Sequence, residues 1–262
     1  MIITVDIGNT DIVCGVFKNN ELLHHWRFSS STKSSTDEYM MKYFSLFKIY
    51  EIDYRKDIQG AIIGSVVPEL IRKHHKALYN LLGKTPVIVN STLEWNMKLS
   101  FEHPEEIGVD RLLNVLAAKE LYGLPAMVVD YGTATTIDII SENAEYLGGT
   151  IAPGILISRD ALSTRTAQLP SISLEVPPAV IGKNTVSSMR SGILYGSAGQ
   201  TQHLIEKIMK EFPTSREPYL ILTGGFANLM HQLLPFEALV DPYLTLKGLN
   251  ILYLQNPHSS SV

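Results

Sequence analysis

Short apolar runs alternate with turn residues over the first 30 positions of the chain. Residues 2–5 form a β-branched run that ends in Asp-x-Gly, and residues 12–17 and 21–28 have strand-like content on either side of a turn at residues 18–20. Runs of this kind, bounded by Gly, Asn and Asp, are typical of strands joined by hairpins. The chain is therefore predicted to open as strand, glycine turn, strand, turn, strand.

Helical and strand-like patterns then alternate up to residue 89. Apolar residues at helical spacing follow Thr36, residues 59–67 read as a buried strand stopped by Pro68, and a helix over 70–82 precedes a short strand at 86–89. This alternation favours a mixed or parallel sheet covered by helices. We expect the adjacent histidines on these elements to be solvated, because neighbours in sequence do not share a face: His24 and His25, His74 and His75.

The same order of elements begins again near residue 110. A helix is predicted over 111–122, a buried strand over 126–129 that again ends in Asp-x-Gly, and two further strands over 136–140 and 144–151. The two aspartates, Asp6 and Asp130, lie 130 − 6 = 124 positions apart in a chain of 262 residues. The matching hairpin context favours a duplicated fold over a chance repeat.

Composition limits the classes of protein to which the chain can belong. It has 45% apolar and 18% charged residues and a formal net charge of −4, which gives no global attraction to nucleic acid or to an anionic membrane. Its one cysteine, Cys14, excludes an intrachain disulfide. No basic segment precedes Asp6, as a signal peptide would require. We therefore expect a cytoplasmic protein that binds neither nucleic acid nor membrane.

Each Asp-x-Gly turn has the features of a loop that holds phosphate. Glycine lets the backbone come close to a phosphate chain, and backbone N–H groups and Thr or Asn side chains can donate to its oxygens. An Asp beside such a loop repels phosphate unless a cation lies between them, so Asp6 and Asp130 predict Mg²⁺ or another metal ion. Neither loop is a Walker P-loop, because the chain lacks Gly-x-x-x-x-Gly-Lys-[Ser/Thr].

Asp110 is the candidate catalytic base. It stands where the cap of the helix over 111–122 is expected, and Arg111 follows it. Phosphoryl transfer needs a group that accepts the proton of the attacking hydroxyl, and an adjacent Arg suits an anionic substrate. The spacing leaves two interpretations open, a catalytic carboxylate and a simple helix cap. The Thr-Gly-Gly at residues 223–225 is likewise either a flat surface for a nucleoside or a plain turn.

Seven motifs of these types occur in order along almost the whole chain. They are Asp-Ile-Gly-Asn-Thr at 6–10, Gly-Val-Asp-Arg at 108–111, Asp-Tyr-Gly-Thr-Ala-Thr-Thr at 130–136, Gly-Gly-Thr-Ile-Ala-Pro-Gly at 148–154, Arg-Thr-Ala-Gln-Leu-Pro at 165–170, Ile-Gly-Lys-Asn-Thr at 181–185 and Thr-Gly-Gly at 223–225. Each motif alone is weak, but the ordered set resembles the type III pantothenate kinase family.

The resemblance implies transfer of the γ-phosphoryl group of ATP to the hydroxyl of pantothenate, the first step of coenzyme A biosynthesis. It implies Asp110 as proton acceptor, Asp130 as ligand of a monovalent cation, K⁺ or NH₄⁺, a need for Mg²⁺ with ATP, and a homodimer. The implied ATP-binding residues are Asp6, Ile7, Gly8, Asn9, Thr10, Asp11, Ile12, Val13 and Thr133. The implied pantothenate-binding residues are Phe101, Gly108, Val109, Asp110, Arg111 and Thr185.

One position departs from the family pattern. The family commonly has a Tyr shortly before the Pro that precedes Gly-x-Asp-Arg, and Phe101 stands there in this chain. The ring is kept and the hydroxyl is lost, so one hydrogen bond to substrate is in doubt. A typical hydrogen bond is worth about 0.5–1.5 kcal/mol net.

The fold implied is α/β, a duplicated actin-like (ribonuclease H-like) two-domain fold of the superfamily that contains sugar kinases, heat-shock ATPases and actin. Mixed sheets flanked by helices and a cleft between the domains belong to this expectation. The domains are predicted over 1–110 and 111–262. Two alternatives remain at this point: an actin-like kinase for another small alcohol, and a non-catalytic ATP-binding regulator.

Overall fold

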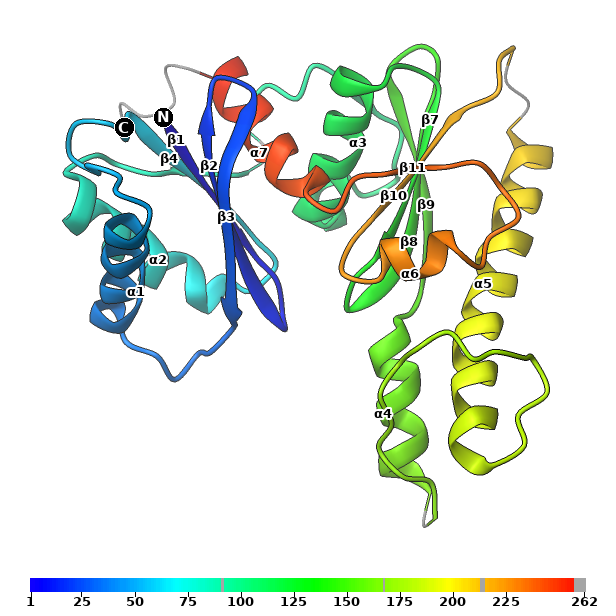
Figure 1. The fold of residues 1–262 in the computed structure, drawn as a ribbon. Helices are drawn as coiled ribbons and strands as arrows, with labels where there is room; N and C mark the ends of the chain where they lie inside the picture. Colours follow the sequence, from blue (N-terminus) through cyan, green and yellow to red (C-terminus); the bar gives the residue numbers. More distant parts are fainter. Residues whose placement is uncertain (91, 167, 213–214, 257–262) are drawn as a thin grey trace. The chain divides into compact units, whose positions relative to one another are not determined.

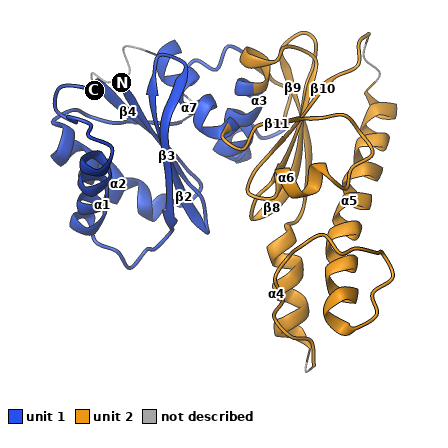
Figure 2. Ribbon diagram, viewed as in Figure 1, with its two compact units in different colours: residues 1–97, 102–117, 244–262 blue, residues 98–101, 118–243 orange. Residues whose placement is uncertain are grey.

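The structure, a computed structural model, describes residues 1–90, 92–166, 168–212 and 215–256 and separates into two compact units (Figure 2). Unit 1 contains Met1–Met97, Glu102–Ala117 and Leu244–Val262, and unit 2 contains Lys98–Phe101 and Ala118–Tyr243. Unit 1 is thus built from three separate segments of the chain. The division into domains at residue 110 stays a prediction.

Unit 1 contains a five-stranded mixed sheet in the order β3-β2-β1-β4-β5 (Figure 1). β1 pairs antiparallel with β2 and parallel with β4, and the predicted opening of three strands is confirmed. β1, the central strand of this sheet, is rich in β-branched residues and almost entirely buried, as expected for a strand covered on both faces. The strands are β1 (Ile2–Ile7), β2 (Asp11–Lys18), β3 (Glu21–Ser29), β4 (Gly60–Ser65) and β5 (Val87–Ile88).

Local signals explain where the helices of unit 1 begin and end. Ser35 and Glu38 form a capping box at the start of α1, and α2 starts at Pro68 and ends before Gly83, which has a φ of 67°. The helices are α1 (Thr36–Ile49), α2 (Pro68–Leu82), α3 (Val109–Leu121) and α7 (Leu244–Gln255), with a 3₁₀ turn, η1 (Pro104–Glu106). Only the first part of α3, through Ala117, belongs to unit 1.

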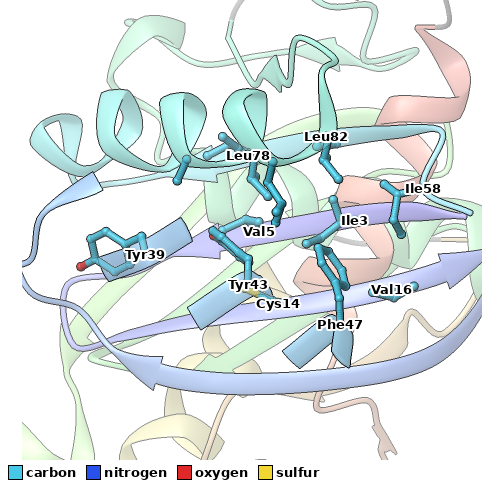
Figure 3. Close-up of a cluster of buried hydrophobic side chains, with 14 of the residues drawn as sticks. Ile3, Val5, Cys14, Val16, Tyr39, Tyr43, Phe47, Ile58, Leu78 and Leu82 are labelled. Atoms are coloured by element: carbon cyan, nitrogen blue, oxygen red, sulfur yellow. The ribbon is translucent and has the colours of Figure 1, made fainter. Parts of the chain in front are cut away.

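Helices α1 and α2 pack on the sheet of unit 1 and bury an aromatic-rich core. Figure 3 shows this cluster, in which side chains of the helices meet those of the strands: Ile3, Val5, Cys14, Val16, Tyr39, Tyr43, Phe47, Ile58, Leu78 and Leu82. Helix α7 contacts β1 and β4, and the hydroxyl of Tyr253 occupies the space where a side chain on Gly60 would lie. The Asn250 amide also donates to the carbonyl of Asn19 at 2.8 Å, which ties α7 to the β2–β3 turn.

Unit 2 repeats the strand order of unit 1. Its six-stranded sheet has the order β11-β10-β7-β8-β9-β6, so that β9-β8-β7-β10-β11 corresponds to β3-β2-β1-β4-β5, with the same parallel and antiparallel pairings. The predicted duplication is therefore visible in the topology. The strands are β6 (Lys98–Leu99), β7 (Ala126–Tyr131), β8 (Ala134–Ile140), β9 (Glu145–Pro153), β10 (Tyr219–Thr223) and β11 (Leu239–Val240).

Three helices complete unit 2: α4 (Ile155–Arg165), α5 (Thr185–Glu211) and α6 (Ala227–His231). Asn184 and Ser187 form a capping box at the start of α5. The core lies between the sheet and α5, and it includes Met127, Tyr131, Leu194 and Ile205. Tyr131 donates a hydrogen bond to Thr201 of α5 at 3.0 Å inside this core.

The expectation that both histidine pairs are solvated is wrong for His74. This side chain is fully buried, and its Nδ1 lies 2.6 Å from the hydroxyl of Tyr43. Periodicity explains the position, because His74 lies on the same face of α2 as the core residues Leu70, Ala77 and Leu78. Burial lowers the pKa of His74 from its ordinary value to about 3, and Lys42 and Lys73 act in the same direction.

Candidate active site

The first phosphate loop connects β1 to β2 and is closed by a backbone hydrogen bond. The N–H of Gly8 donates to the carbonyl of Asp11 at 2.9 Å. The side chains of Asn9 and Thr10 are exposed at the tip, and Asp6 lies half-buried at the end of β1. The loop therefore presents its backbone and two polar side chains to solvent, as a phosphate ligand requires.

The apolar residues of this segment are placed differently from the polar ones. Ile7 and Ile12 face each other in the β1–β2 ladder and are fully buried, so they anchor the two ends of the loop in the sheet. The carboxylate of Asp11 accepts a hydrogen bond from Arg27 on β3 at 3.3 Å, in an exposed ion pair. Exposed pairs of this kind contribute little stability.

The second phosphate loop connects β7 to β8, is one residue shorter than the first, and is also closed by a bond from its glycine N–H. The N–H of Gly132 donates to the carbonyl of Ala134 at 3.0 Å, and Thr133 is exposed at the tip. Gly154 lies directly behind this loop, since a Cβ there would collide with the carbonyl of Thr133. The absence of a side chain at residue 154 thus allows β9 to end against the loop.

The Asp130 carboxylate lies between two glycines. Asp130 pairs in register with Thr223 of β10, and the chain turns sharply after that strand through Gly224, which has a φ of 87°. A Cβ at Gly224 would collide with Oδ1 of Asp130, and one at Gly132 would lie 3.3 Å from the same oxygen. The carboxylate therefore packs against both glycines, and a side chain at residue 224 would displace it.

Asp110 lies in the first turn of α3. The sequence predicted it as the cap before the helix, but α3 begins one residue earlier, at Val109. Its Oδ1 accepts a hydrogen bond from the N–H of Arg111 at 2.9 Å, and a Cβ on Gly108 would stand 2.6 Å from that oxygen. Burial raises the pKa of Asp110, although the Arg111 N–H bond and the Arg111 charge oppose that rise. Arg111 itself is buried.

Phe101 belongs to unit 2 and packs against β9. Its ring lies 3.3 Å from the position of a Cβ on Gly148, and its centroid is 6.2 Å from that of Tyr146. The hydroxyl of Tyr146 donates to the buried Asp138 at 2.8 Å, and Thr136 donates to the other oxygen of this carboxylate at 3.1 Å. The ring thus covers a buried polar network.

Thr185 is the first residue of α5 and lines a cavity of about 560 Å³. Apolar side chains of α4, of the segment after it and of α5 form most of the wall, and Ser188 adds a second hydroxyl. Other wall residues are Leu162, Leu169, Met189, Gly192 and Ile193. Within the motif at 165–170, Ala167 lies outside the described residues.

The structure gathers the expected site residues in two groups. Unit 1 contains Asp6–Val13 and Gly108–Arg111, and unit 2 contains Phe101, Asp130, Thr133 and Thr185. Over the residues that the structure describes, no group of three or more His, Cys, Asp or Glu side chains could hold a metal ion, and no helix is long and apolar enough to span a membrane.

Sequence reasoning missed two contributors. One is Ser30, which bonds to the first loop from the end of β3 and carries no local motif. The other is the role of Gly224 beside Asp130. The Thr-Gly-Gly motif marked residue 224 as a close approach but did not identify its neighbour.

Comparison with known proteins identifies relatives over nearly the whole chain. Residues 2–207 match the family model described as Type III pantothenate kinase. The chain is 44% identical over 256 residues to the Type III pantothenate kinase of Moorella thermoacetica and 40% identical over 256 residues to that of Halalkalibacterium halodurans, covering 98% of this chain and 100% of each relative.

Solved structures add evidence on the fold alone. Component A of the (R)-2-hydroxyglutaryl-CoA dehydratase of Acidaminococcus fermentans superposes with a TM-score of 0.55 at 12% identity and covers 98% of this chain and 99% of its own. The predicted α/β fold with two mixed sheets flanked by helices is confirmed.

Proposed function

The chain belongs to the type III pantothenate kinase family, and we propose that it transfers the γ-phosphoryl group of ATP to the hydroxyl of pantothenate with Asp110 as proton acceptor. The reaction forms phosphopantothenate and ADP, the first step of coenzyme A biosynthesis. The observation that carries the residue assignment is the partly buried Asp110 carboxylate, which accepts a hydrogen bond from the N–H of Arg111 in the first turn of α3.

Asp110 is suited to this role by its environment. The pantothenate oxygen forms a bond to the γ-phosphorus, the bond from that phosphorus to the bridging oxygen of ADP breaks, and the hydroxyl proton passes to the carboxylate. Burial raises the pKa of Asp110, which makes the carboxylate a stronger base than an exposed Asp. Its hydrogen bond from the Arg111 N–H holds one oxygen in place. Gly108 has no side chain, which leaves room for the same oxygen of Asp110.

The first loop, Asp6–Val13, is assigned to the ATP phosphates. Its exposed tip and its closing hydrogen bond from Gly8 support this role. Ile7 and Ile12 would contribute by anchoring the loop in the sheet, because both residues are fully buried. In the second loop, the exposed Thr133 is assigned as a further contact to ATP.

Two cations accompany this assignment. Mg²⁺ is bound in proteins by one or two carboxylates together with substrate phosphates, so the missing three-carboxylate cluster does not conflict with it, and Asp6 would hold it. The monovalent cation, K⁺ or NH₄⁺, is assigned to Asp130, whose half-buried carboxylate lies at the end of β7 against Gly132 and Gly224. These cations neutralise phosphate charge when bound.

The pantothenate site is assigned to the remaining residues of the pattern. They are Phe101, Gly108, Val109, Asp110, Arg111 and Thr185. Arg111 supplies a positive charge for the carboxylate of pantothenate, and its burial strengthens such a contact. Thr185 lines a largely apolar cavity.

A homodimer is the proposed assembly, and unit 2 offers a surface for it. Gly192, Gly196 and Gly199 are exposed on α5 at spacings of four and three residues, and a Cβ on any of them would meet nothing within 4 Å. An exposed glycine inside a helix costs about 1 kcal/mol relative to Ala, so three on one face suggest a closely packed partner. Val180 and Ile181 nearby are 61% and 78% exposed. The proposed location is the cytoplasm, where ATP is available.

Turnover by the purified protein tests the proposal. With ATP, Mg²⁺, K⁺ and pantothenate it should form ADP and phosphopantothenate in equal amounts. Replacing pantothenate by sugars and polyols should give no product, which separates this activity from that of a kinase for another alcohol. Folded protein without turnover of pantothenate would contradict the proposal.

A further inference from the structure

Ser30, the residue after β3, makes two hydrogen bonds to the first phosphate loop. Its backbone N–H donates to the carbonyl of Thr10 at 2.9 Å, and its Oγ donates to the carbonyl of Gly8 at 2.5 Å. These carbonyls belong to the first and last residues of the loop tip. One serine, 20 or more positions away in sequence, therefore holds both ends of the tip.

The geometry of the peptide unit determines where the N–H groups of the loop point when these two carbonyls are fixed. A trans peptide unit is planar, and its C=O and N–H point in opposite directions. The peptide units after Gly8 and Thr10 are trans. Because both carbonyls point toward Ser30, the N–H groups of Asn9 and Asp11 point away from it. Ser30 thus orients two donors of the loop in the direction opposite to itself.

The Gly8 N–H bond to Asp11 closes the loop, but it does not involve either of the two carbonyls that Ser30 holds. Gly8 is conformationally permissive, and Asn9 and Thr10 are exposed at the tip. Ordering a flexible backbone residue on ligand binding costs about 1–2 kcal/mol, a cost that is avoided if the loop is ordered beforehand. The exposed ion pair of Arg27 with Asp11 is a weak restraint by comparison.

We propose that Ser30 is a positioning residue that orders the Gly8–Thr10 loop, so that its N–H groups face the phosphates of the bound nucleoside triphosphate. This inference rests on the proposed function, in which the loop binds ATP. It places a determinant of nucleotide affinity outside the Asp-x-Gly motif. The Oγ–Gly8 bond is the part that a substitution can remove, because the Ser30 N–H remains in any variant except Pro.

The experiment compares Ser30→Ala with wild type in steady-state kinetics and in direct ATP titration by calorimetry. Loss of one hydrogen bond should raise both the KM and the Kd for ATP about three- to tenfold. The KM for pantothenate should not change, since the two hydrogen bonds of Ser30 go to the loop assigned to ATP. Ser30→Thr, which keeps a hydroxyl, should restore ATP binding. Ser29→Ala is the matched control, because Ser29 is exposed and one residue away.

Each outcome decides between the alternatives. An unchanged KM and Kd for ATP in Ser30→Ala would overturn the inference while leaving the kinase activity of wild type intact. Equal losses for ATP and pantothenate, or failure of Ser30→Thr to recover, would indicate a general structural role and also overturn it. Wild type that neither binds ATP nor turns over would contradict the proposed function itself. If Ser30→Ala does not fold, Ser30→Cys provides the weaker donor for the same comparison.

Discussion

Gly224 stands directly against the carboxylate of Asp130, so that a methyl group at residue 224 would collide with Oδ1. This contact connects the end of β10 to the end of β7, two strands paired in parallel. A Cβ there would also lie 2.6 Å from the backbone carbonyl of Tyr131. We expect Gly224→Ala to displace the carboxylate together with the start of the second loop, to lower kcat about tenfold or more, and to weaken the response to K⁺. Titration of the activity with K⁺ and NH₄⁺ measures the effect.

Ala at residue 224 would also strain the backbone, because a φ of 87° is unfavourable for Ala, so this effect is measured in a separate variant. Gly83 has a φ of 67° and no atom near the position of its Cβ, so Gly83→Ala brings strain without a collision. It should lower stability by about 1 kcal/mol and leave the kinetics unchanged. Equal effects of both variants on K⁺ dependence would argue against the assignment of Asp130.

Asp110→Asn tests the proton acceptor. Turnover should be almost abolished, because an amide cannot accept the proton, while the amide oxygen can still accept the N–H of Arg111. In wild type, activity should fall as the pH falls through the pKa of Asp110, and burial places that decline above the usual range for Asp. A pH profile of kcat/KM measures it. Rates like those of wild type would reduce Asp110 to a residue of the first helical turn.

The same variant should be more stable than wild type at pH 7. The folded-state pKa of Asp110 is raised above its unfolded value, so the ionised carboxylate destabilises the fold at any pH above that raised pKa. This loss of stability disappears as the pH falls through the raised pKa and Asp110 becomes protonated. Denaturant unfolding should therefore show a higher midpoint for Asp110→Asn at neutral pH and a smaller difference in acid. A stable but inactive variant would separate catalysis from folding.

The sequence predicts most of unit 1 because its signals are local. The β-branched run of β1, the capping residues Ser35 and Glu38 and the Pro68 start of α2 are each visible in a few adjacent positions. The neighbours in the site are different. Asp130 and Gly224 meet only because β7 and β10 pair, and Ser30 reaches its loop only because β3 returns alongside β2. Such contacts depend on sheet order, which single motifs do not contain.

Asp110 shows the limit of local signals at a helix end. An Asp before an apolar periodic run is the ordinary sign of a cap. In the structure the helix starts at Val109, and the Asp110 side chain bonds to the N–H of the next residue instead. Its burial, which determines its basicity, comes from tertiary packing that sequence spacing does not reveal.

The burial of His74 predicts a pH dependence of stability. Its pKa is lowered to about 3 in the folded protein, whereas the unfolded chain protonates near 6.5. The folded protein, in which His74 is neutral, therefore keeps its full stability above pH 6.5 and loses stability as the pH falls below that value. Between pH 7 and pH 5 this residue should remove about 2 kcal/mol from the free energy of unfolding.

Urea unfolding across that pH range measures this loss. His74→Phe should be less stable at pH 7, because the buried hydroxyl of Tyr43 loses its partner, but its stability should change less with pH. His75→Gln, at a partly exposed neighbour, should keep the slope of wild type. An unchanged slope in His74→Phe would assign the pH dependence to other groups.

Phe101→Tyr would restore the hydroxyl that the family commonly has at this position. If that hydroxyl reaches pantothenate, the KM for pantothenate should fall about two- to tenfold, the worth of one hydrogen bond. The KM for ATP should stay the same. Phe101→Leu, which removes the ring that covers Gly148, should act in the opposite direction. No change in Phe101→Tyr would show that the hydroxyl is not used.

Gly196→Gln tests the dimer surface on α5. A large side chain should block close packing of a partner, and analytical ultracentrifugation should then report a monomer with lower activity. Gly196→Ala is the matched control, since Ala stays small and improves helix propensity by about 1 kcal/mol. Both variants should keep the helix content of wild type. A dimer that persists in Gly196→Gln would place the interface elsewhere.

Helix α7 gives unit 1 an unusual order of assembly. It packs on β1 and β4, fills the space over Gly60 with Tyr253, and comes from the end of the chain. On the ribosome, the first 117 residues therefore emerge without the helix that covers part of their sheet, and all of unit 2 is synthesised before that helix appears. Unit 1 is thus completed only by a segment that is synthesised after unit 2.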